Sequence, residues 1–461
     1  MAVHPRDRAL LDVRTQDAPL LRGVLLPAQN FLHTAGLGGA ALISAAVIAV
    51  GWANSPLRDS YQALWHAQIG FHFFSYQLSA DLRHVVNDVL MVFFFYVAGL
   101  EIKRAFVAGE LADRKNAVMP MLAALGGMVV PAAIYALVNM RAPTMQHGWG
   151  VPMATDIAFA VGVLALLGDR ISTQLRLFLL ALAIVDDIGA IAVIAIFYTS
   201  HVYFSAMFFA LVFLGIMGGL LKLGVKRSIP YILLSIAFTA AIAASGIHAT
   251  IAGVILGLLT PRDARFTFGD FVGFLKKNKA QMELSQAKTN PYGTEIFLAK
   301  AQEIAFGTEG PADRLERGLH SWTNFVIVPL FALANAGVAF ETGFLRAAMH
   351  STAMWGVLLG LVLGKPLGIV VACWAGVRFK VANLPRGSNW RQIMGLGLVA
   401  GIGFTMSLFI ADLAFDDEKI IDAAKVGIFL ASILAGVLGY YLLRNAQTAP
   451  AVEPEAMAEA H

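Results

Sequence analysis

The sequence has almost no cysteine: Cys373 is the only one among 461 residues, and it lies in an apolar segment. A disulfide within the chain and a metal site built from cysteines are therefore excluded. Charged residues are also scarce, at 14% of the chain. A soluble protein of this length would usually divide into domains joined by polar linkers, but most polar segments here are only short connections. One integral membrane domain describes the chain better.

Motifs for nucleotide binding are missing as well. The segment Gly364-Lys365-Pro366 is not a phosphate-binding loop, because the glycine expected five positions before Gly364 is absent and Pro366 replaces the residue that would hold magnesium. Nucleotide-driven pumping is therefore not expected of this chain alone. We predict no cofactor, no nucleotide or nucleic-acid partner and no enzymatic activity.

Hydrophobic residues make up 58% of the chain. They gather in blocks of about twenty residues, the length that crosses a bilayer as a helix. We predict an all-α polytopic membrane protein with twelve transmembrane helices embedded in the lipid bilayer. The predicted spans are residues 33–52, 84–102, 117–139, 148–168, 174–199, 203–222, 229–244, 246–260, 321–340, 353–377, 392–414 and 422–443.

The charges of the connecting segments favour twelve spans over eleven. The seventh and eighth blocks are short and meet at Ser245-Gly246, so one long helix there would give eleven spans. Eleven spans would place the basic segment 378–391 outside. Twelve spans place most Lys and Arg residues inside, as the positive-inside rule requires. We therefore predict that both termini are cytoplasmic.

This pattern divides the chain into three regions. Residues 1–32 are predicted to be a cytoplasmic N-terminal tail, residues 33–443 the membrane domain and residues 444–461 a cytoplasmic C-terminal tail. The long cytoplasmic loop 262–320 is either partly helical or mobile. The external, aromatic-rich stretch 69–78 is either a small β-hairpin or a loop lying on the membrane interface.

Two adjacent acids, Asp186 and Asp187, interrupt the apolar run of the fifth predicted span. An ionised Asp at the centre of a membrane helix opposes insertion by about 2.5–3.5 kcal/mol, so the pair opposes it by about 5–7 kcal/mol. Ionisable residues inside a membrane usually mark an ion or proton pathway. The pair is therefore the first candidate for a functional site.

The fourth and eleventh predicted spans contain residues that interrupt helices or carry polar groups. These are Pro152, Thr155 and Asp156 in the fourth span, and Gly401, Gly403, Thr405 and Ser407 in the eleventh. Irregular backbone at membrane depth is tolerated only inside protein or beside a water-filled cavity. Interruptions at matching positions of the third-to-fifth and tenth-to-twelfth spans indicate an inverted-repeat transporter. Alternatively, Gly and Pro are simply common in membrane helices, but this leaves Asp156 unexplained.

Lys365 in the tenth predicted span is a candidate counter-charge for the acidic pair. Adjacent residues of a helix point about 100° apart, so Asp186 and Asp187 cannot both face one neighbour. One of them can face a cavity while the other pairs with Lys365. Our hypothesis is that the partner of Lys365 is Asp186, because the two are opposite charges in apolar spans. The alternative is that Lys365 extends its amine to the membrane interface.

Several motifs, taken in order from the second span to the eleventh, make the chain similar to the NhaA family of sodium/proton antiporters. They are Val86-Asn-Asp-Val-Leu-Met91, Gly99-Leu-Glu-Ile-Lys-Arg104, Ala154-Thr-Asp-Ile-Ala-Phe-Ala160, Ala183-Ile-Val-Asp-Asp-Ile-Gly189, Ser245-Gly-Ile-His-Ala-Thr250, Asn335-Ala-Gly337, Gly364-Lys-Pro-Leu-Gly368 and Gly401-Ile-Gly-Phe-Thr-Met406. Each motif alone is weak, but together they are highly specific.

The resemblance implies an activity and a fold. The activity is electrogenic, pH-regulated exchange of sodium or lithium ions for protons across a bacterial inner membrane, serving sodium and pH homeostasis. The fold has an inverted repeat with unwound, crossing fourth and eleventh helices. A homodimer held partly by the external β-hairpin is also implied.

The resemblance also implies roles for particular residues. Asp187 and Asp186 would hold the transported sodium ion and the protons, with Thr155 and Asp156 at the helix crossing and Lys365 as their basic partner. The unwound part of the eleventh span would comprise Gly401, Gly403 and Thr405.

Four further residues are implied near the cytoplasmic entrance or in the pH response: Glu101, Glu316 and His248, with Asp88 deeper in the second span. The residues themselves allow plainer interpretations. Asp88 is equally well a structural cap or pair, His248 a hydrogen-bonded packing residue, and Glu101 a member of an interfacial cluster with its basic neighbours.

Two other functions compete with antiport. An intramembrane aspartyl protease would need two carboxyls sharing a proton at close range, whereas adjacent helical residues diverge and no second Asp-centred motif of that class is found in the sequence. A proton- or sodium-coupled transporter of another small solute, or a cation channel, is the alternative. Proton flux that needs only the cation distinguishes antiport from solute-coupled transport. Saturable exchange distinguishes antiport from a channel.

Overall fold

The computed structural model describes residues 36–446 apart from 74–75, 110, 200, 226–227, 279–290, 341–342 and 386. The predicted N-terminal tail, and the predicted C-terminal tail beyond residue 446, lie outside the described residues. The described chain is mainly helical and forms two compact units. One unit combines Met1–Arg83, Arg114–Ala190 and Asn324–His461, and the other combines His84–Asp113 and Ile191–Thr323.

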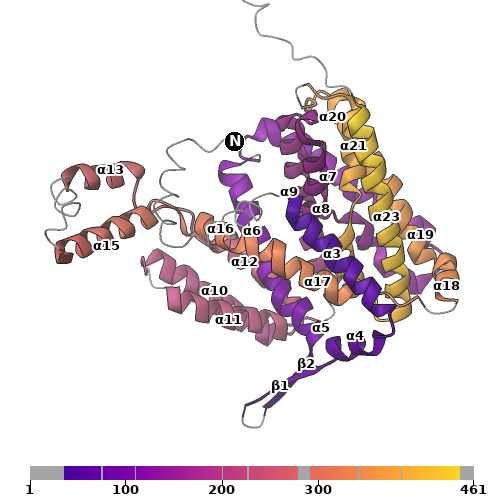
Figure 1. The fold of residues 1–461 in the computed structure, drawn as a ribbon, viewed down its shortest axis with the longest axis horizontal. Helices are drawn as coiled ribbons and strands as arrows, with labels where there is room; N and C mark the ends of the chain where they lie inside the picture. Colours follow the sequence, from indigo (N-terminus) through magenta and orange to yellow (C-terminus); the bar gives the residue numbers. More distant parts are fainter. Residues whose placement is uncertain are drawn as a thin grey trace, which may run out of the picture. The chain divides into compact units, whose positions relative to one another are not determined.

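Most elements of the first unit are helices (Figure 1). They are α3 (Gly36–Ala53), α4 (Arg58–Trp65), β1 (Gln68–Phe73), β2 (Tyr76–Asp81), α7 (Arg114–Val138), η2 (Pro143–Met153), α8 (Ile157–Leu167), η3 (Gly168–Arg170), α9 (Thr173–Phe197, in this unit as far as Ala190), α17 (Val328–Asn335), α18 (Phe344–His350), α19 (Thr352–Leu359), η5 (Gly360–Gly364), α20 (Lys365–Arg378), α21 (Trp390–Ala400), α22 (Phe404–Ala414) and α23 (Glu418–Asn445).

The second unit contains the remaining helices, two of which continue from or into the first. They are α5 (Leu82–Val85), η1 (Val86–Leu90), α6 (Met91–Ala108), α10 (Phe204–Lys222), α11 (Ser228–Ala244), α12 (Ala249–Leu259), α13 (Phe268–Lys277), α15 (Pro291–Gly307), α16 (Pro311–Trp322) and η4 (Thr323–Ile327). Figure 1 shows α13 and α15 projecting away from α6, α10, α11 and α12. The described residues of the predicted loop 262–320 are therefore largely helical, which agrees with one of its two interpretations.

Each predicted apolar block contains helix in the described chain, but residues 154–156, 336–340 and 402–403 within three of the blocks are not helical. Among the described residues, six helices are long and apolar enough to cross a membrane, and up to nine spans result if each of three bent helix pairs counts as one. The bent pairs are Gly38–Ala53 with Arg58–Trp65, Pro143–Met153 with Ile157–Leu167, and Trp390–Ala400 with Phe404–Ala414. Two shorter apolar helices are α11 and α12. The chain is a multi-pass helical membrane protein.

A tight turn separates α11 from α12, so the seventh and eighth apolar blocks are two helices. Gly246 in this turn has a φ of +85°, and a Cβ there would lie 1.9 Å from the carbonyl oxygen of His201. Only glycine fits such a backbone and such a contact. Phe238 of α11 and Leu256 of α12 then pack into one apolar cluster with α10. One long helix through this junction is excluded.

The first unit holds its helices together at small residues. A Cβ added to Gly126 of α7 would lie 2.2 Å from the carbonyl oxygen of Gly368 in α20, and a Cβ added to Gly189 of α9 would lie 2.1 Å from the sulfur of Met128. Small residues allow helix backbones to approach closely where the bilayer supplies no hydrophobic driving force. These contacts bring the start of α20 and the middle of α9 against α7.

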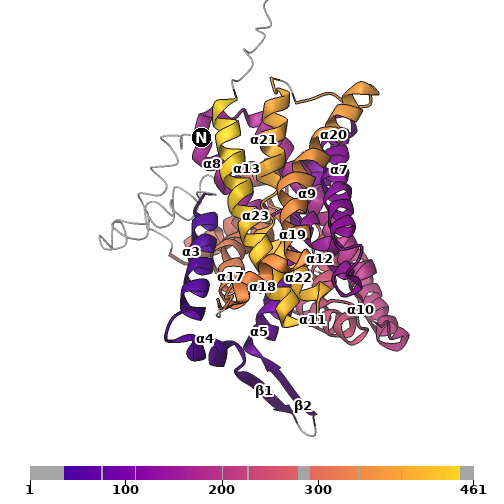
Figure 2. The same ribbon diagram turned by 90° about the vertical axis from the view of Figure 1, so that its right-hand side faces the viewer.

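The aromatic stretch after α4 forms a β-hairpin, one of its two predicted alternatives. Strands β1 and β2 pair antiparallel, with Gln68 opposite Asp81 and Phe73 opposite Tyr76. Figure 2 shows the hairpin projecting beyond α4 of the same unit. Its backbone therefore offers two strand edges away from the helices of the first unit.

Candidate functional site

Two helices of the first unit are broken at the positions that the sequence indicates. Between η2 and α8 the chain bends by 44°, and between α21 and α22 it bends by 49°. The backbone is extended at Asp156, and its N–H donates to the carbonyl oxygen of Ile402 over 2.7 Å. The two breaks therefore contact each other directly, and each supplies a backbone partner that the other lacks.

Asp156 accepts hydrogen bonds from the N-termini of two different helices. Its Oδ1 accepts from the N–H of Phe159 over 3.0 Å, which caps α8. Its Oδ2 accepts from the N–H and the hydroxyl of Thr405 in α22, over 3.1 and 2.6 Å. Helix N-termini carry unpaired N–H groups and partial positive charge. The buried carboxylate of Asp156 therefore offsets the partial positive charge at the N-termini of both α8 and α22.

Side-chain donors serve the opposite ends of the same breaks. The hydroxyl of Thr155 lies 2.8 Å from the carbonyl oxygen of Ala400, the last residue of α21, and 2.7 Å from Asp186 Oδ2. The hydroxyl of Ser407 donates to the carbonyl oxygen of Val151 over 2.8 Å. Because a hydroxyl has one proton, Thr155 donates to Ala400 or to Asp186 at any moment.

Lys365 meets Asp186 in the interior, at the contact that the sequence predicts. Its Nζ lies 2.6 Å from Asp186 Oδ2, and both side chains are completely buried. Nζ also donates to the carbonyl oxygen of Met153, the last residue of η2. The ammonium group of Lys365 therefore contacts both the carboxylate of Asp186 and the C-terminal end of η2, where the helix carries partial negative charge. Extension of Lys365 to a membrane interface is ruled out.

Asp187 is also buried, with 6% of its surface exposed. It follows Asp186 in α9, and the helix turns its side chain by about 100° away from that of its neighbour. Asp186 Oδ1 is buried and has no hydrogen-bond partner among the described residues. Lys365 and Thr155 both contact Oδ2 of Asp186, so its Oδ1 is a carboxylate oxygen that neither of them binds.

In the second unit, Glu101 and Glu316 belong to one cluster of charges between α6 and α16. Arg104 Nη1 lies 2.6 Å from Glu316 Oε1, and His320 Nδ1 lies 3.2 Å from Glu101 Oε1. The contact with Glu101 raises the pKa of His320 above its usual value. Burial raises the pKa of Glu316, and Arg104 opposes that effect.

His248 and Asp88 lie away from this cluster. His248 precedes α12 and its Nε2 lies 3.1 Å from the carbonyl oxygen of Tyr198. Asp88, in the π-helical turn η1, lies 2.9 Å from His84 Nε2, and the side chains of His84 and Asp88 are 67% and 48% exposed. Thirteen residues separate Asp88 from Glu101, which is about 20 Å along a helix.

Some participants in these contacts were not predicted. His320 completes the α6–α16 cluster, and it follows Glu316 by one helical turn, a spacing that could have drawn attention to it. Arg104 was expected only as a basic neighbour of Glu101, and its contact with Glu316 was not predicted. The carbonyl groups of Met153 and Ala400 were not predicted because every residue carries one. Only the placement of the helix breaks selects them.

The fold and the site together define a class of protein. Apolar helices, two of them broken where buried carboxylates and a buried lysine meet, make this a multi-pass membrane protein with an internal ionisable site. Membrane transporters of ions and protons use that arrangement.

Comparison with known proteins specifies the class further. The model of the Na+/H+ antiporter 1 family matches residues 29–443. The Na(+)/H(+) antiporter NhaA 2 of Sorangium cellulosum is 44% identical over 454 residues, 95% of this chain and 96% of that protein. The Na(+)/H(+) antiporter NhaA of Wolinella succinogenes is 42% identical over 90% of this chain and 92% of that protein. The Na(+)/H(+) antiporter NhaA of Koribacter versatilis is also 42% identical, over 96% of each chain. The chain belongs to the Na+/H+ antiporter 1 family.

Proposed function

We propose that this protein is a secondary antiporter that exchanges sodium or lithium ions for protons across a bacterial inner membrane. Membership of a sodium/proton antiporter family supports this function and agrees with the prediction that the chain is not an enzyme. The single observation that carries the proposal to particular residues is the buried contact of Lys365 with Asp186, beside Asp187 and the two helix breaks.

Competition for negative charge is the proposed basis of exchange. A buried carboxylate must be neutralised by a proton, by a metal cation or by Lys365, because an unpaired ion is costly there. Asp187 is the proposed direct cation ligand, and Asp186 is the coupled partner of Lys365. An arriving sodium ion displaces protons, and exchange follows if only loaded or protonated forms reorient.

The cation would need oxygen ligands beyond the two carboxylates. Among the residues that the structure describes, no three His, Cys, Asp or Glu side chains converge as a metal site requires. The hydroxyl of Thr155 and carbonyl oxygens of the broken helices are the nearest suitable groups, and unwound backbone is a recurring sodium ligand in transporters. Asp156 holds the breaks together and completes the proposed site.

We propose the finer architecture on the same basis. It has twelve spans in residues 33–443, an inverted repeat, crossing fourth and eleventh spans, cytoplasmic termini and a cytoplasmic 262–320 segment. The contact between the two breaks supports the crossing, with Gly401, Gly403 and Thr405 in the unwound part. The projecting β-hairpin, proposed to be external, supports a homodimer joined by its strand edges.

The function is tested by reconstituting the purified protein in proteoliposomes that contain no organic solute. We expect saturable proton efflux on addition of sodium or lithium, and a membrane potential generated by the exchange. Flux that requires an added organic solute would overturn antiport in favour of solute-coupled transport. Flux that does not saturate would indicate a channel.

We propose that the α6–α16 cluster, formed by Glu101, Arg104, Glu316 and His320, contributes to the pH response. His248 and Asp88 would act separately from this cluster. Because the folded-state pKa of His320 is raised, its contact is fully present below the unfolded value of about 6.5 and is lost as pH rises through the folded pKa. Loss of the contact at high pH would weaken the attachment of α16 to α6, which the contact of Arg104 with Glu316 would still maintain. The expected pH response is therefore activation on the alkaline side.

Replacing His320 by glutamine should shift the activation of exchange to lower pH. Glutamine cannot carry the proton that strengthens the contact with Glu101, so the contact is weak at every pH. The shift should be at most about one pH unit, because a half-exposed pair contributes up to about 1 kcal/mol. Exchange rates of proteoliposomes over a pH series measure it, with the exposed His350→Gln as the control. An unchanged profile for His320→Gln would remove the cluster from the pH response.

A further inference from the structure

Two cavities adjoin the start of α21, where it meets α20 and α23. One has a volume of about 420 Å³ and is lined by Asn389, Trp390, Arg391 and Asn445. The other has a volume of about 520 Å³ and shares Trp390 and Arg391 with the first. Its remaining lining is apolar: Val370, Val371, Trp374, Met394 and Leu442. Together they form what we call the α21 groove, with one polar half and one apolar half.

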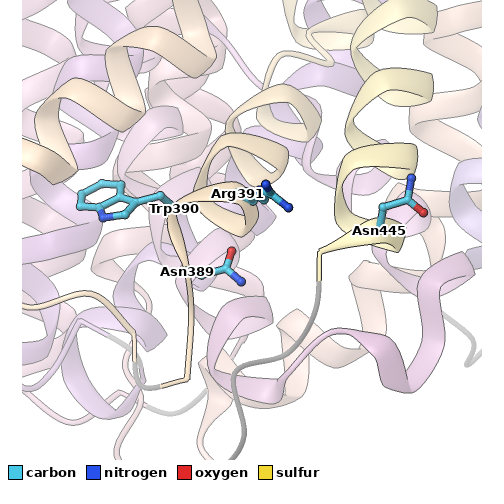
Figure 3. Close-up of a pocket in the computed structure, with 4 residues that line it drawn as sticks. All are labelled: Asn389, Trp390, Arg391 and Asn445. Carbon is cyan, nitrogen blue, oxygen red and sulfur yellow. The ribbon is translucent and has the colours of Figure 1, made fainter.

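The polar half is suited to an anion. Arg391 is exposed, and no carboxylate lies within ion-pair distance of it in the described part of the chain. Figure 3 shows Trp390 and Arg391 pointing in opposite directions from the start of α21, with Arg391 on the side of Asn445. The N-terminus of α21 is already capped by the side chains of Asn389 and Gln392, so Arg391 supplies the positive charge of this half. A phosphate group would find a guanidinium and an amide donor here.

The apolar half is suited to a hydrocarbon chain. Val371 and Trp374 of α20 are 57% and 56% exposed, and Trp390 is 40% exposed. Trp side chains are enriched where membrane helices meet the headgroup layer, because the ring is apolar and its N–H is polar. The apolar half leads from that level along α20. An acyl chain attached to the phosphate would lie in it.

We propose that the α21 groove is a binding site for an anionic phospholipid, with the headgroup phosphate on Arg391 and Asn445 and an acyl chain along Val371 and Trp374. A basic pocket between membrane helices is a recurring kind of headgroup site. The proposal concerns none of the residues assigned to ion exchange. It requires only that the chain is embedded in a bilayer.

Native mass spectrometry of the purified, delipidated protein with added phosphatidylglycerol tests the site. Arg391→Gln should weaken phosphatidylglycerol binding about fivefold, since one basic residue near an anionic lipid contributes roughly that factor. Val371→Trp should also weaken it by filling the apolar half without changing charge. Arg378→Gln is the matched control, because Arg378 is exposed on α20 but lines neither cavity.

The competing ligands give distinct results. Phosphatidylcholine should bind the wild-type protein more weakly than phosphatidylglycerol, and inorganic phosphate should not displace the lipid. Equal binding of both lipids, or displacement by inorganic phosphate, would overturn an anionic-lipid site. So would equal losses in Arg391→Gln and Arg378→Gln, or unchanged binding in Val371→Trp. If adduct loss instead followed dissociation of a dimer, the groove would belong to an interface between copies.

Discussion

Replacing Asp187 by asparagine, and separately Asp186 by asparagine, should abolish sodium-dependent proton exchange or reduce it to near background while leaving the protein folded. Asparagine keeps the shape and can hydrogen-bond, but it cannot alternate between a proton and a metal cation. Each substitution therefore removes one of the two charges that we propose to drive exchange. The loss should exceed a hundredfold in rate, since a carboxylate in contact with the cation is worth several kcal/mol, or about 10² and more.

Everted membrane vesicles with a pH-sensitive fluorescent dye measure this effect. After respiration acidifies the vesicles, sodium should restore the fluorescence with the wild-type protein and fail to do so with either variant. Asp416→Asn is the matched control, because Asp416 is an exposed acid between α22 and α23. Sodium-dependent dequenching that persisted in both variants would contradict the assignment of the site.

Replacing Lys365 by alanine should produce the largest loss of stability. Asp186 would then be a buried carboxylate without its cation, and breaking a buried ion pair in this way costs about 3–5 kcal/mol. The carbonyl group of Met153 would lose its donor as well. Thermal unfolding of the purified protein in detergent should therefore begin at a clearly lower temperature, whereas Lys419→Ala, at the exposed start of α23, should leave it unchanged.

Combining Lys365→Ala with Asp186→Asn tests whether the two side chains act as a pair. The double variant has no unpaired charge at this position, so it should be no less stable than either single variant. Residues in direct contact show such non-additivity, whereas independent residues do not. Strictly additive losses would mean that the 2.6 Å contact contributes nothing specific to the fold.

Much of the helical fold and of the site's composition could be predicted from the sequence. Length and hydropathy placed the apolar blocks correctly, because a bilayer sets the length of a helix and removes most polar residues from it. The contact of Lys365 with Asp186 was predicted because opposite charges in apolar segments need each other. The breaks near Asp156 and Gly401 were predicted from residues that a continuous helix disfavours.

Other parts of the molecule depend on contacts that no local pattern records. The π-helical turns Val86–Leu90 and Gly360–Gly364, which contain Asp88 and precede Lys365, follow from packing and not from residue type. The pairing of α6 with α16 unites residues more than two hundred positions apart, so His320 and the contact of Arg104 with Glu316 were missed. His248 was grouped with Glu101 by resemblance alone, and the structure places it elsewhere in the same unit.

The double cap formed by Asp156 has a consequence for how the chain is made. Its second partner, Thr405, lies 249 positions further along the sequence. At about 5–20 residues per second, a ribosome needs about 12–50 s to add that distance. During this interval Asp156 is already part of the chain, but its partner Thr405 has not yet been synthesised. A nascent chain that stalls before α22 therefore carries Asp156 with the cap of α8 as its partner and without the hydrogen bonds from Thr405.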